Sequence, residues 1–254
     1  MELLILGGTR FAGRWLAEQA MAAGHRVTLM HRGRTDASAL PEAEHLIGDR
    51  DGGLAVLGER RWDAVVDTSG YVPRVVRASA EALKGRVGAY LFVSSISVYA
   101  EPVPAGFTEN HALAILDDPT TEEFVGPAYG GLKVLCEGVV RDVLGDRAVI
   151  VRPGVIAGPR DYMDRFAYWV RRVAKGGDVL APGDPGQGVQ FVDARDVAAF
   201  YLDLITHGVQ GVFQVTGPQE RLSMRAFLES ARDTLGGDAR FTWVDEAFLL
   251  AEGV

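Results

Sequence analysis

Short apolar runs alternate with helix-length segments through residues 1–152, and this alternation constrains the fold more than any other feature of the chain. The pattern predicts strands at 3–6, 26–30, 45–47, 64–67, 89–93 and 148–151, and helices at 11–23, 73–83 and 128–144. Strand–helix alternation is typical of right-handed βαβ units, and strands that are apolar throughout are covered on both faces of a parallel sheet. We therefore expect an α/β fold with a doubly wound parallel Rossmann sheet.

After residue 152, pairs of turn-forming Gly and Pro crowd the sequence. A helix at 166–174 is expected among them, and a helix at 194–206 with a strand at 212–215 restores the alternation. The sequence thus predicts a dinucleotide-binding domain at 1–152 and a smaller, interleaved substrate lobe over most of 153–254, with 190–216 returning to the first domain. At the end, Asp245 is a candidate N-cap for a short helix. Its apolar residues either pack on the main body or belong to a fragment of a longer chain.

A glycine-rich turn, Gly-Gly-Thr-Arg-Phe-Ala-Gly, separates the first expected strand from the first helix. The N–H groups at such a helix N-terminus can hold the pyrophosphate of a dinucleotide. The first glycine permits the tight turn, and the last lets the helix pack close to the strand. A purely structural strand–helix turn is the alternative. The candidate cofactor-binding residues of the turn are Gly7, Thr9, Arg10, Phe11, Ala12 and Gly13.

The end of the second strand, His31-Arg32, bears on the choice of dinucleotide. An acidic residue there would accept hydrogen bonds from the ribose 2′-hydroxyl of NAD and repel a 2′-phosphate. Arg32, with Arg10 nearby in such a fold, is instead suited to charge-assisted bonds with that phosphate. We therefore favour NADP slightly over NAD, the alternative being that both arginines simply face water.

Tyr129 and Lys133 lie four residues apart at the start of the longest helix and so share one face. A neighbouring ammonium favours the phenolate and brings tyrosine into the acid–base range, while the lysine can also hold ribose hydroxyls. Ser95 follows the fifth strand, at the edge of the sheet where ligands bind. Its hydroxyl can hydrogen-bond a substrate carbonyl or alcohol, or it can cap backbone groups at the strand end. Ser95, Tyr129 and Lys133 are the candidate catalytic residues.

In their order and spacing, the glycine turn, the Ser95 segment and the Tyr129–Lys133 pair resemble the extended short-chain dehydrogenase/reductases. The resemblance covers essentially the whole chain and is to the NAD-dependent epimerase/dehydratase branch, in particular a divergent subgroup with a Gly-Gly-Thr-Arg-Phe turn, some members of which bind RNA. It implies that Ser95 orients the substrate, that Tyr129 is the acid/base, and that Lys133 binds ribose and lowers the pKa of Tyr129. Further cofactor contacts implied at strand ends are Asp49, Arg50, Thr68 and Pro153.

The resemblance also implies a homodimer formed through the helices that begin at Pro73 and Ala128. Relatives in the subgroup continue beyond the point where this sequence stops, which implies a truncated substrate lobe. Ile96 and Ser97 stand where 4,6-dehydratases carry an acidic pair, and this argues against dehydration. The Asn and the diphosphate-binding Arg of nucleotide-sugar epimerases are also replaced, by Val155 and Val189, which argues against a UDP-sugar. The alternative is that Arg160 or Arg165 substitutes as the partner of a diphosphate.

The sequence therefore predicts NAD(P)-dependent hydride transfer at a carbinol or ketone carbon of a sugar-like or small carbonyl substrate. Net epimerisation follows if the cofactor is retained, and net reduction if it dissociates. The competing hypothesis is a non-catalytic dinucleotide-binding protein, either a redox sensor or an RNA-binding relative. A formal charge of −8 argues against nucleic acid as a partner. One cysteine, scattered histidines and no long apolar run predict no disulfide, metal site or membrane span, and we expect a cytoplasmic location.

Overall fold

The computed structural model describes residues 1–35, 38 and 40–253, and its contacts divide the chain into two units. The first unit comprises Met1–Gly154 and Ala194–Val215, and the second comprises Val155–Asp193 and Thr216–Val254. The chain thus leaves the first unit after Gly154, forms part of the second, and returns to the first for one helix and one strand between Ala194 and Val215. The expected division, 1–152 with 190–216 returning, differs from this one by a few residues at each boundary.

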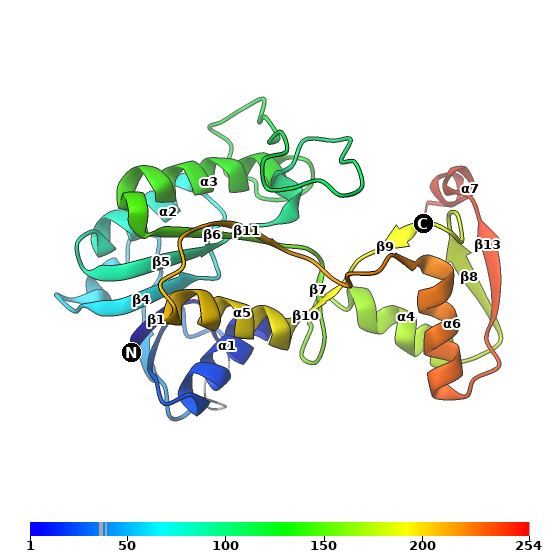
Figure 1. The fold of residues 1–254 in the computed structure, drawn as a ribbon, viewed down its shortest axis with the longest axis horizontal. Coiled ribbons are helices and arrows are strands. Elements are labelled where there is room, and N and C mark those ends of the chain that lie inside the picture. The colour runs from blue at the N-terminus through cyan, green and yellow to red at the C-terminus, as the bar shows by residue number, and fades with distance from the viewer. Residues whose placement is uncertain (36–37, 39, 254) are drawn as a thin grey trace. The chain divides into compact units, whose positions relative to one another are not determined.

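The first unit is built on a seven-stranded parallel sheet in the order β11-β6-β5-β4-β1-β2-β3 (Figure 1). Its strands are β1 (Glu2–Leu6), β2 (Arg26–His31), β3 (Glu44–Ile47), β4 (Trp62–Asp67), β5 (Val87–Val93), β6 (Ala148–Pro153) and β11 (Gly211–Val215). Its helices are α1 (Phe11–Ala22), η1 (Leu54–Leu57), α2 (Pro73–Leu83), η2 (Ile96–Val98), α3 (Ala128–Leu144), η3 (Gly145–Arg147) and α5 (Ala194–Thr206).

Two helical layers cover this sheet. Helices α1 and α5 pack together on one face, and α2 and α3 pack together on the other (Figure 1). Fully buried side chains such as Leu4, Phe92, Cys136 and Val140 fill the core between the sheet and the second layer. Strands that are apolar throughout are stable only when both faces of the sheet are covered, and these two layers cover both faces. The predicted doubly wound parallel fold is confirmed.

The direction in which successive strands are added to the sheet reverses between β1 and β4, although the two strands are parallel. From β1 the chain proceeds through β2 to β3 on one side, and from β4 it proceeds toward β11 on the other. The carboxyl ends of β1 and β4 therefore meet at a topological switch point, the place where open parallel sheets bind ligands. Both the backbone N–H and the hydroxyl of Thr68 donate to the Leu6 carbonyl oxygen there, at 3.1 and 3.0 Å.

The second unit packs two helices against small sheets, with Val173, Val179 and Leu228 fully buried. Its elements are β7 (Ile156–Ala157), α4 (Arg165–Ala174), β8 (Asp178–Pro182), β9 (Gly188–Val189), β10 (Val192–Asp193), β12 (Leu222–Ser223), α6 (Met224–Leu235), β13 (Arg240–Val244) and α7 (Glu246–Ala251). The predicted N-cap at Asp245 is present, since its carboxylate accepts the Phe248 N–H at 2.7 Å. Helix α6 and the parallel pair β8–β13 are absent from the elements expected from sequence.

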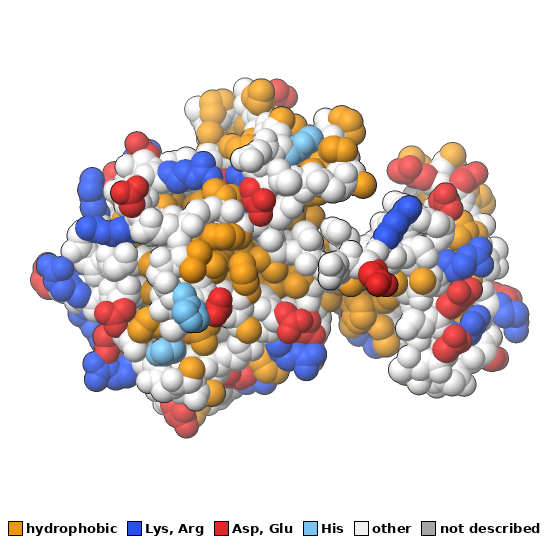
Figure 2. Space-filling model, in the orientation of Figure 1, with side chains coloured by type: hydrophobic (Ala, Val, Ile, Leu, Met, Phe, Trp, Pro, Cys, Tyr) orange, Lys and Arg blue, Asp and Glu red, His pale blue; other side chains and the backbone are white. Residues whose placement is uncertain are grey.

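The charged surface is mixed in sign. Figure 2 shows Lys and Arg side chains interspersed with Asp and Glu over the visible face of the first unit. This distribution accompanies a formal net charge of −8 for the whole sequence. Among the helices that the structure describes, none combines the length and the apolar character needed to cross a membrane.

Candidate active site

The glycine turn after β1 is shaped so that side chains would not fit. Gly7 and Gly8 have φ angles of +102° and +82°, in the region that favours glycine. A Cβ atom at Gly7 would lie 2.5 Å from the Thr68 hydroxyl oxygen, and one at Gly13 would lie 2.9 Å from the Gly8 Cα. The glycines therefore let the start of α1 pack directly against the backbone of the turn and against the residue after β4. The N-terminus of α1 thus lies at the switch point.

The start of α1 suits an anion. Arg10 is the N-cap residue, and its side chain has only hydrogen-bond donors, so it cannot accept the N–H groups of the first turn. The described first turn also holds no acidic side chain. The positive end of the helix dipole and these N–H groups thus meet at the carboxyl edge of the sheet. The residues present fit the pyrophosphate of a dinucleotide.

The end of β2 carries a chain of hydrogen bonds between two histidines. The Gly33 N–H lies 3.1 Å from His31 Nδ1, His31 Nε2 lies 3.0 Å from His45 Nδ1, and His45 Nε2 lies 3.0 Å from the Leu40 carbonyl oxygen. Only neutral rings with Nε2–H can satisfy all three contacts. Burial, with His45 as a second cause, lowers the pKa of His31, which agrees with the neutral ring. Both nitrogens of His31 are used internally, and the exposed residue beside it is Arg32.

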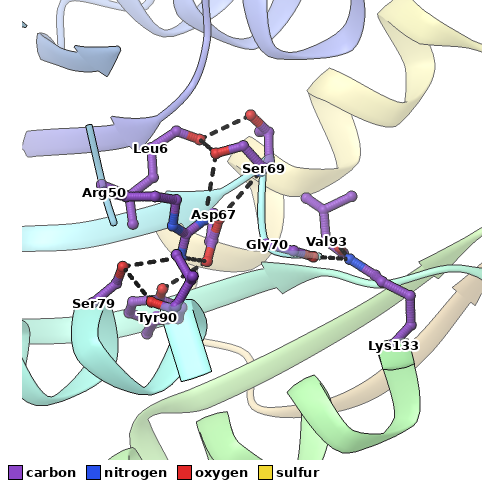
Figure 3. A network of polar contacts seen from close by, with 11 residues as sticks. Leu6, Arg50, Asp67, Ser69, Gly70, Ser79, Tyr90, Val93 and Lys133 are labelled. Carbon is purple, nitrogen blue, oxygen red and sulfur yellow. Dashed lines mark hydrogen bonds and ion pairs between the residues drawn. The ribbon is translucent and has the colours of Figure 1, made fainter. Parts of the chain in front are cut away.

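A buried ion pair stands at the ends of β3 and β4. Arg50 donates to the two carboxylate oxygens of Asp67 at 2.6 and 2.8 Å, and it also donates to the hydroxyls of Ser69 and Ser79 (Figure 3). The Tyr90 hydroxyl donates to Asp67 at 2.8 Å. The sequence places Arg50 among the cofactor-binding residues, but its guanidinium lies inside the unit and serves Asp67. The neighbouring candidate, Asp49, is exposed.

The Asp67 carboxylate stays ionised inside the protein. Burial by itself raises its pKa, but the charge and hydrogen bonds of Arg50 and the hydrogen bond from Tyr90 bring the pKa below its usual value. Asp67 also accepts the Ser69 N–H at 3.1 Å. The ion pair therefore fixes the segment after β4, which lies directly beside Gly7 at the switch point.

The candidate acid/base helix approaches the serine segment through a glycine. A Cβ atom at Gly130, next to Tyr129, would lie 2.1 Å from the Ser97 carbonyl oxygen. Only glycine at this position lets α3 lie against η2, the short helix that follows Ser95. The Ser95 hydroxyl accepts the Ser97 N–H and donates to the Ser97 hydroxyl, both at 3.1 Å. Ser95 is thus a helix cap and lies at the carboxyl end of β5 as well.

Lys133 is buried beneath this region, with a relative exposure of 2%. Its ammonium donates to the carbonyl oxygens of Gly70 at 2.6 Å and Val93 at 2.7 Å, so it ties the end of β4 to the end of β5 (Figure 3). Burial lowers its pKa to about 8, against the opposing charge of Asp67. The lysine therefore stands at the predicted edge of the sheet, bonded to backbone.

A second buried ion pair holds α3 on β6. Arg152 donates to the Glu137 carboxylate at 2.9 and 2.6 Å, and both side chains are 2% exposed. Arg152 also donates to the Tyr99 hydroxyl and to the Glu109 carbonyl oxygen. Sequence reasoning missed this pair, although Glu137 follows Lys133 by one helical turn. Pro153, the candidate that follows Arg152, is buried at the end of β6.

No metal centre is evident in the described part of the chain, where no three His, Cys, Asp or Glu residues are grouped to bind an ion. The candidate residues Gly7, Arg32, Asp49, Thr68 and Ser95 instead follow the ends of successive parallel strands. Because those ends share one edge of the sheet, the structure gathers the candidates along that edge.

A parallel doubly wound sheet with a glycine turn at its switch point defines a dinucleotide-binding fold. The chain belongs to the NAD dependent epimerase/dehydratase family, whose model matches residues 3–216. The resemblance stated from the sequence motifs is thereby confirmed.

Individual relatives extend the comparison. The chain is 27% identical over 234 residues to the chloroplast stem-loop binding protein of 41 kDa b of Arabidopsis thaliana, covering 85% of this chain and 58% of that protein. The UDP-glucuronic acid 4-epimerase of Bacillus cereus, solved with NAD, matches with a TM-score of 0.76 at 20% identity, covering 96% of this chain and 87% of that one. The UDP-glucose 4-epimerase of Thermus thermophilus, also solved with NAD, matches with a TM-score of 0.72 at 20% identity, covering 100% and 93%. At such identities the solved structures establish the fold.

Proposed function

We propose that the protein is a nicotinamide-dependent enzyme that transfers hydride at a carbinol or ketone carbon. The observation that carries this proposal is the gathering of the glycine turn, the Ser95 segment and the Tyr129 helix on one edge of one sheet. Family membership and solved relatives that hold NAD support it. When bound, the cofactor accepts or supplies the hydride at its nicotinamide ring.

The chain's own residues would handle the proton and the orientation of the substrate. Tyr129 exchanges the hydroxyl proton of the substrate as hydride moves, which is the task of a general acid/base. Ser95 keeps an acceptor lone pair beyond its bonds within η2, which suits the hydroxyl of a carbinol substrate. To orient a ketone oxygen, its O–H turns from the Ser97 hydroxyl to the substrate. Lys133 carries a positive charge one helical turn from Tyr129, which favours the phenolate. Two of its three N–H groups are donated to Gly70 and Val93, so one is left for a ribose hydroxyl.

The proposed substrate class depends on two positions at which UDP-sugar epimerases carry polar residues. Solved relatives act on UDP-sugars by their names, but in this sequence Val155 and Val189 stand at the positions where nucleotide-sugar epimerases carry an Asn and a diphosphate-binding Arg. A sugar-like or small carbonyl substrate without a nucleotide is therefore favoured. Epimerisation and reduction use the same three residues, and retention of the cofactor decides between them.

A turnover panel tests the proposal. NADH and NADPH oxidation is followed with UDP-glucose, UDP-glucuronic acid, unmodified aldoses and ketoses, and small ketones, and epimerised products are analysed by chromatography. The expected result is turnover of at least one non-nucleotide carbonyl substrate. Cofactor binding without any turnover across the panel would contradict the enzyme proposal and favour a binding protein such as the stem-loop relative.

For the cofactor we favour NADP slightly over NAD. Both ring nitrogens of His31 are used by Gly33 and His45, and the residue directly after β2 is the exposed Arg32. Guanidinium groups recognise phosphate with paired hydrogen bonds, so Arg32 and Arg10 suit a 2′-phosphate. Titration with both dinucleotides distinguishes the two, and tighter binding of NAD would contradict the preference. The homodimer through α2 and α3 stays a prediction.

A further inference from the structure

Arg74, the second residue of α2, is bound by two carboxylates from different loops. It donates to Asp51, in the loop after β3, at 2.8 and 3.0 Å. It also donates to Glu122, in the loop before α3, at 2.9 and 3.2 Å. These partners lie 23 and 48 residues away along the chain, so a single guanidinium joins two loops that the sequence keeps far apart.

An aromatic stack makes a second contact between the same segments. The rings of Tyr71 and Phe124 lie 5.0 Å apart with an interplanar angle of 23°. Tyr71 is three residues before Arg74, and Phe124 is two residues after Glu122. The Tyr71 ring also lies 5.3 Å from the ammonium nitrogen of Lys133. Residues 117–127 are therefore attached to the start of α2 at two neighbouring points, immediately beside the candidate active site.

The electrostatic setting explains why Arg74 holds both acids. A cation in the first turn of a helix is disfavoured by the positive end of the helix dipole, so Arg74 is stabilised by neighbouring negative charge. A single exposed ion pair contributes little, and these side chains are about half exposed. Two paired contacts on one planar guanidinium, together with the stack, form a network with fixed geometry. We call this network the Arg74 latch, comprising Arg74, Asp51, Glu122, Tyr71 and Phe124.

The latch joins two loops that carry or adjoin candidate site residues. Asp51 donates its N–H to the carboxylate of Asp49, a cofactor contact implied by the family resemblance, at 3.1 Å. Phe124 lies five residues and Glu122 seven residues before Tyr129. We propose that Arg74 is a positioning residue whose latch keeps residues 117–127 against the cofactor and slows cofactor release. This inference rests on the proposed function, and it favours epimerisation because a retained cofactor returns its hydride to the same substrate.

The rate of cofactor release tests the latch without any substrate. NADPH is bound to the full chain and displaced by excess NADP⁺, and the loss of bound NADPH fluorescence is followed by stopped flow. Arg74→Gln is expected to raise the dissociation rate about fivefold, since it removes two ion pairs. Glu122→Gln leaves the Asp51 pair in place and is expected to have a smaller effect. Arg77→Gln is the matched control, because Arg77 lies on the same helix and pairs with Glu81 and Asp142 instead.

Salt and charge reversal separate the latch from a general structural effect. Added salt is expected to speed release more in the wild type than in Arg74→Gln, because the exposed pairs of the latch are screened in addition to the contacts of the cofactor phosphates. The double variant Arg74→Glu with Glu122→Arg is expected to recover slow release. The latch is overturned by an unchanged release rate in Arg74→Gln, or by the same salt dependence in Arg74→Gln and the wild type. In either case NADPH has been shown to bind, so the proposed function still stands. A wild type that binds neither NADPH nor NADH overturns both.

Discussion

Replacing Tyr129 with phenylalanine is expected to lower kcat by about 10²–10⁴-fold, the usual contribution of a positioned general acid/base. The change removes one hydroxyl and keeps the ring, and the approach of α3 to η2 depends on neighbouring Gly130, which is untouched. Cofactor affinity is therefore expected to stay the same. The measurement is steady-state turnover of the substrate identified by the panel, with NADPH affinity determined in parallel by fluorescence.

A tyrosine far along the chain provides the control for Tyr129. Tyr168→Phe removes an exposed hydroxyl from α4 and is expected to leave kcat unchanged. Wild-type turnover in Tyr129→Phe would refute the acid/base role. Equal losses of turnover and of cofactor affinity would indicate damage to the binding site instead of a missing proton-transfer group.

The second large effect is expected at the buried ion pair. Asp67→Asn leaves the Arg50 guanidinium charged and unpaired in the interior, because Asp67 is fully buried. Breaking one side of such a pair usually costs about 3–5 kcal/mol of unfolding free energy. Urea unfolding followed by circular dichroism measures the difference. Asp142→Asn, which loses an exposed partner of Arg77, is the control and is expected to stay within about 0.5 kcal/mol of the wild type.

The pH dependence gives this prediction a sign. Because the folded protein lowers the pKa of Asp67, the stabilisation is present above the ordinary aspartate pKa of about 4 and is lost as the pH falls through the lower folded value. The advantage of the wild type over Asp67→Asn should therefore be constant near neutrality and shrink in strong acid. Equal stability of the two proteins at pH 7 would show that the ion pair contributes nothing.

Much of the fold is predictable from the sequence, because parallel strands that are buried on both faces consist of continuous apolar runs. Helices α2, α3 and α5 begin and end at the expected residues, because in each of them apolar residues recur at the helical period and form one face. Helix α6 was missed among turn signals, although Ser223 caps it by accepting the Ala226 N–H and Gly236 ends it in the left-handed conformation. Those two caps were readable in the sequence.

The sequence predicts which residues follow the strand ends of the candidate site, but it does not predict the contacts that their side chains make. The resemblance implies that Arg50 contacts the cofactor, whereas in the structure its side chain turns inward to Asp67. This contact depends on the pairing of the strands that places the end of β4 beside the loop after β3, and the local sequence does not show that pairing. Spacing places Lys133 on the face of Tyr129, whereas its bonds to Gly70 and Val93 depend on neighbouring strands. The sequence does not indicate the pairing of Glu122 with Arg74, because the two residues are 48 positions apart and become adjacent only on folding.

The binding of a nicotinamide dinucleotide at the glycine turn is tested most directly by calorimetric titration of three proteins with NADP and NAD. Wild type and Gly138→Ala are expected to bind equally, since a Cβ at Gly138 meets open space, and NADP should bind more tightly than NAD. Gly13→Ala should weaken both by at least about tenfold, or roughly 1.4 kcal/mol, because its Cβ would lie 2.9 Å from the Gly8 Cα. Wild-type affinity in Gly13→Ala, or no binding by the wild type, would contradict the assignment of this turn as the cofactor site.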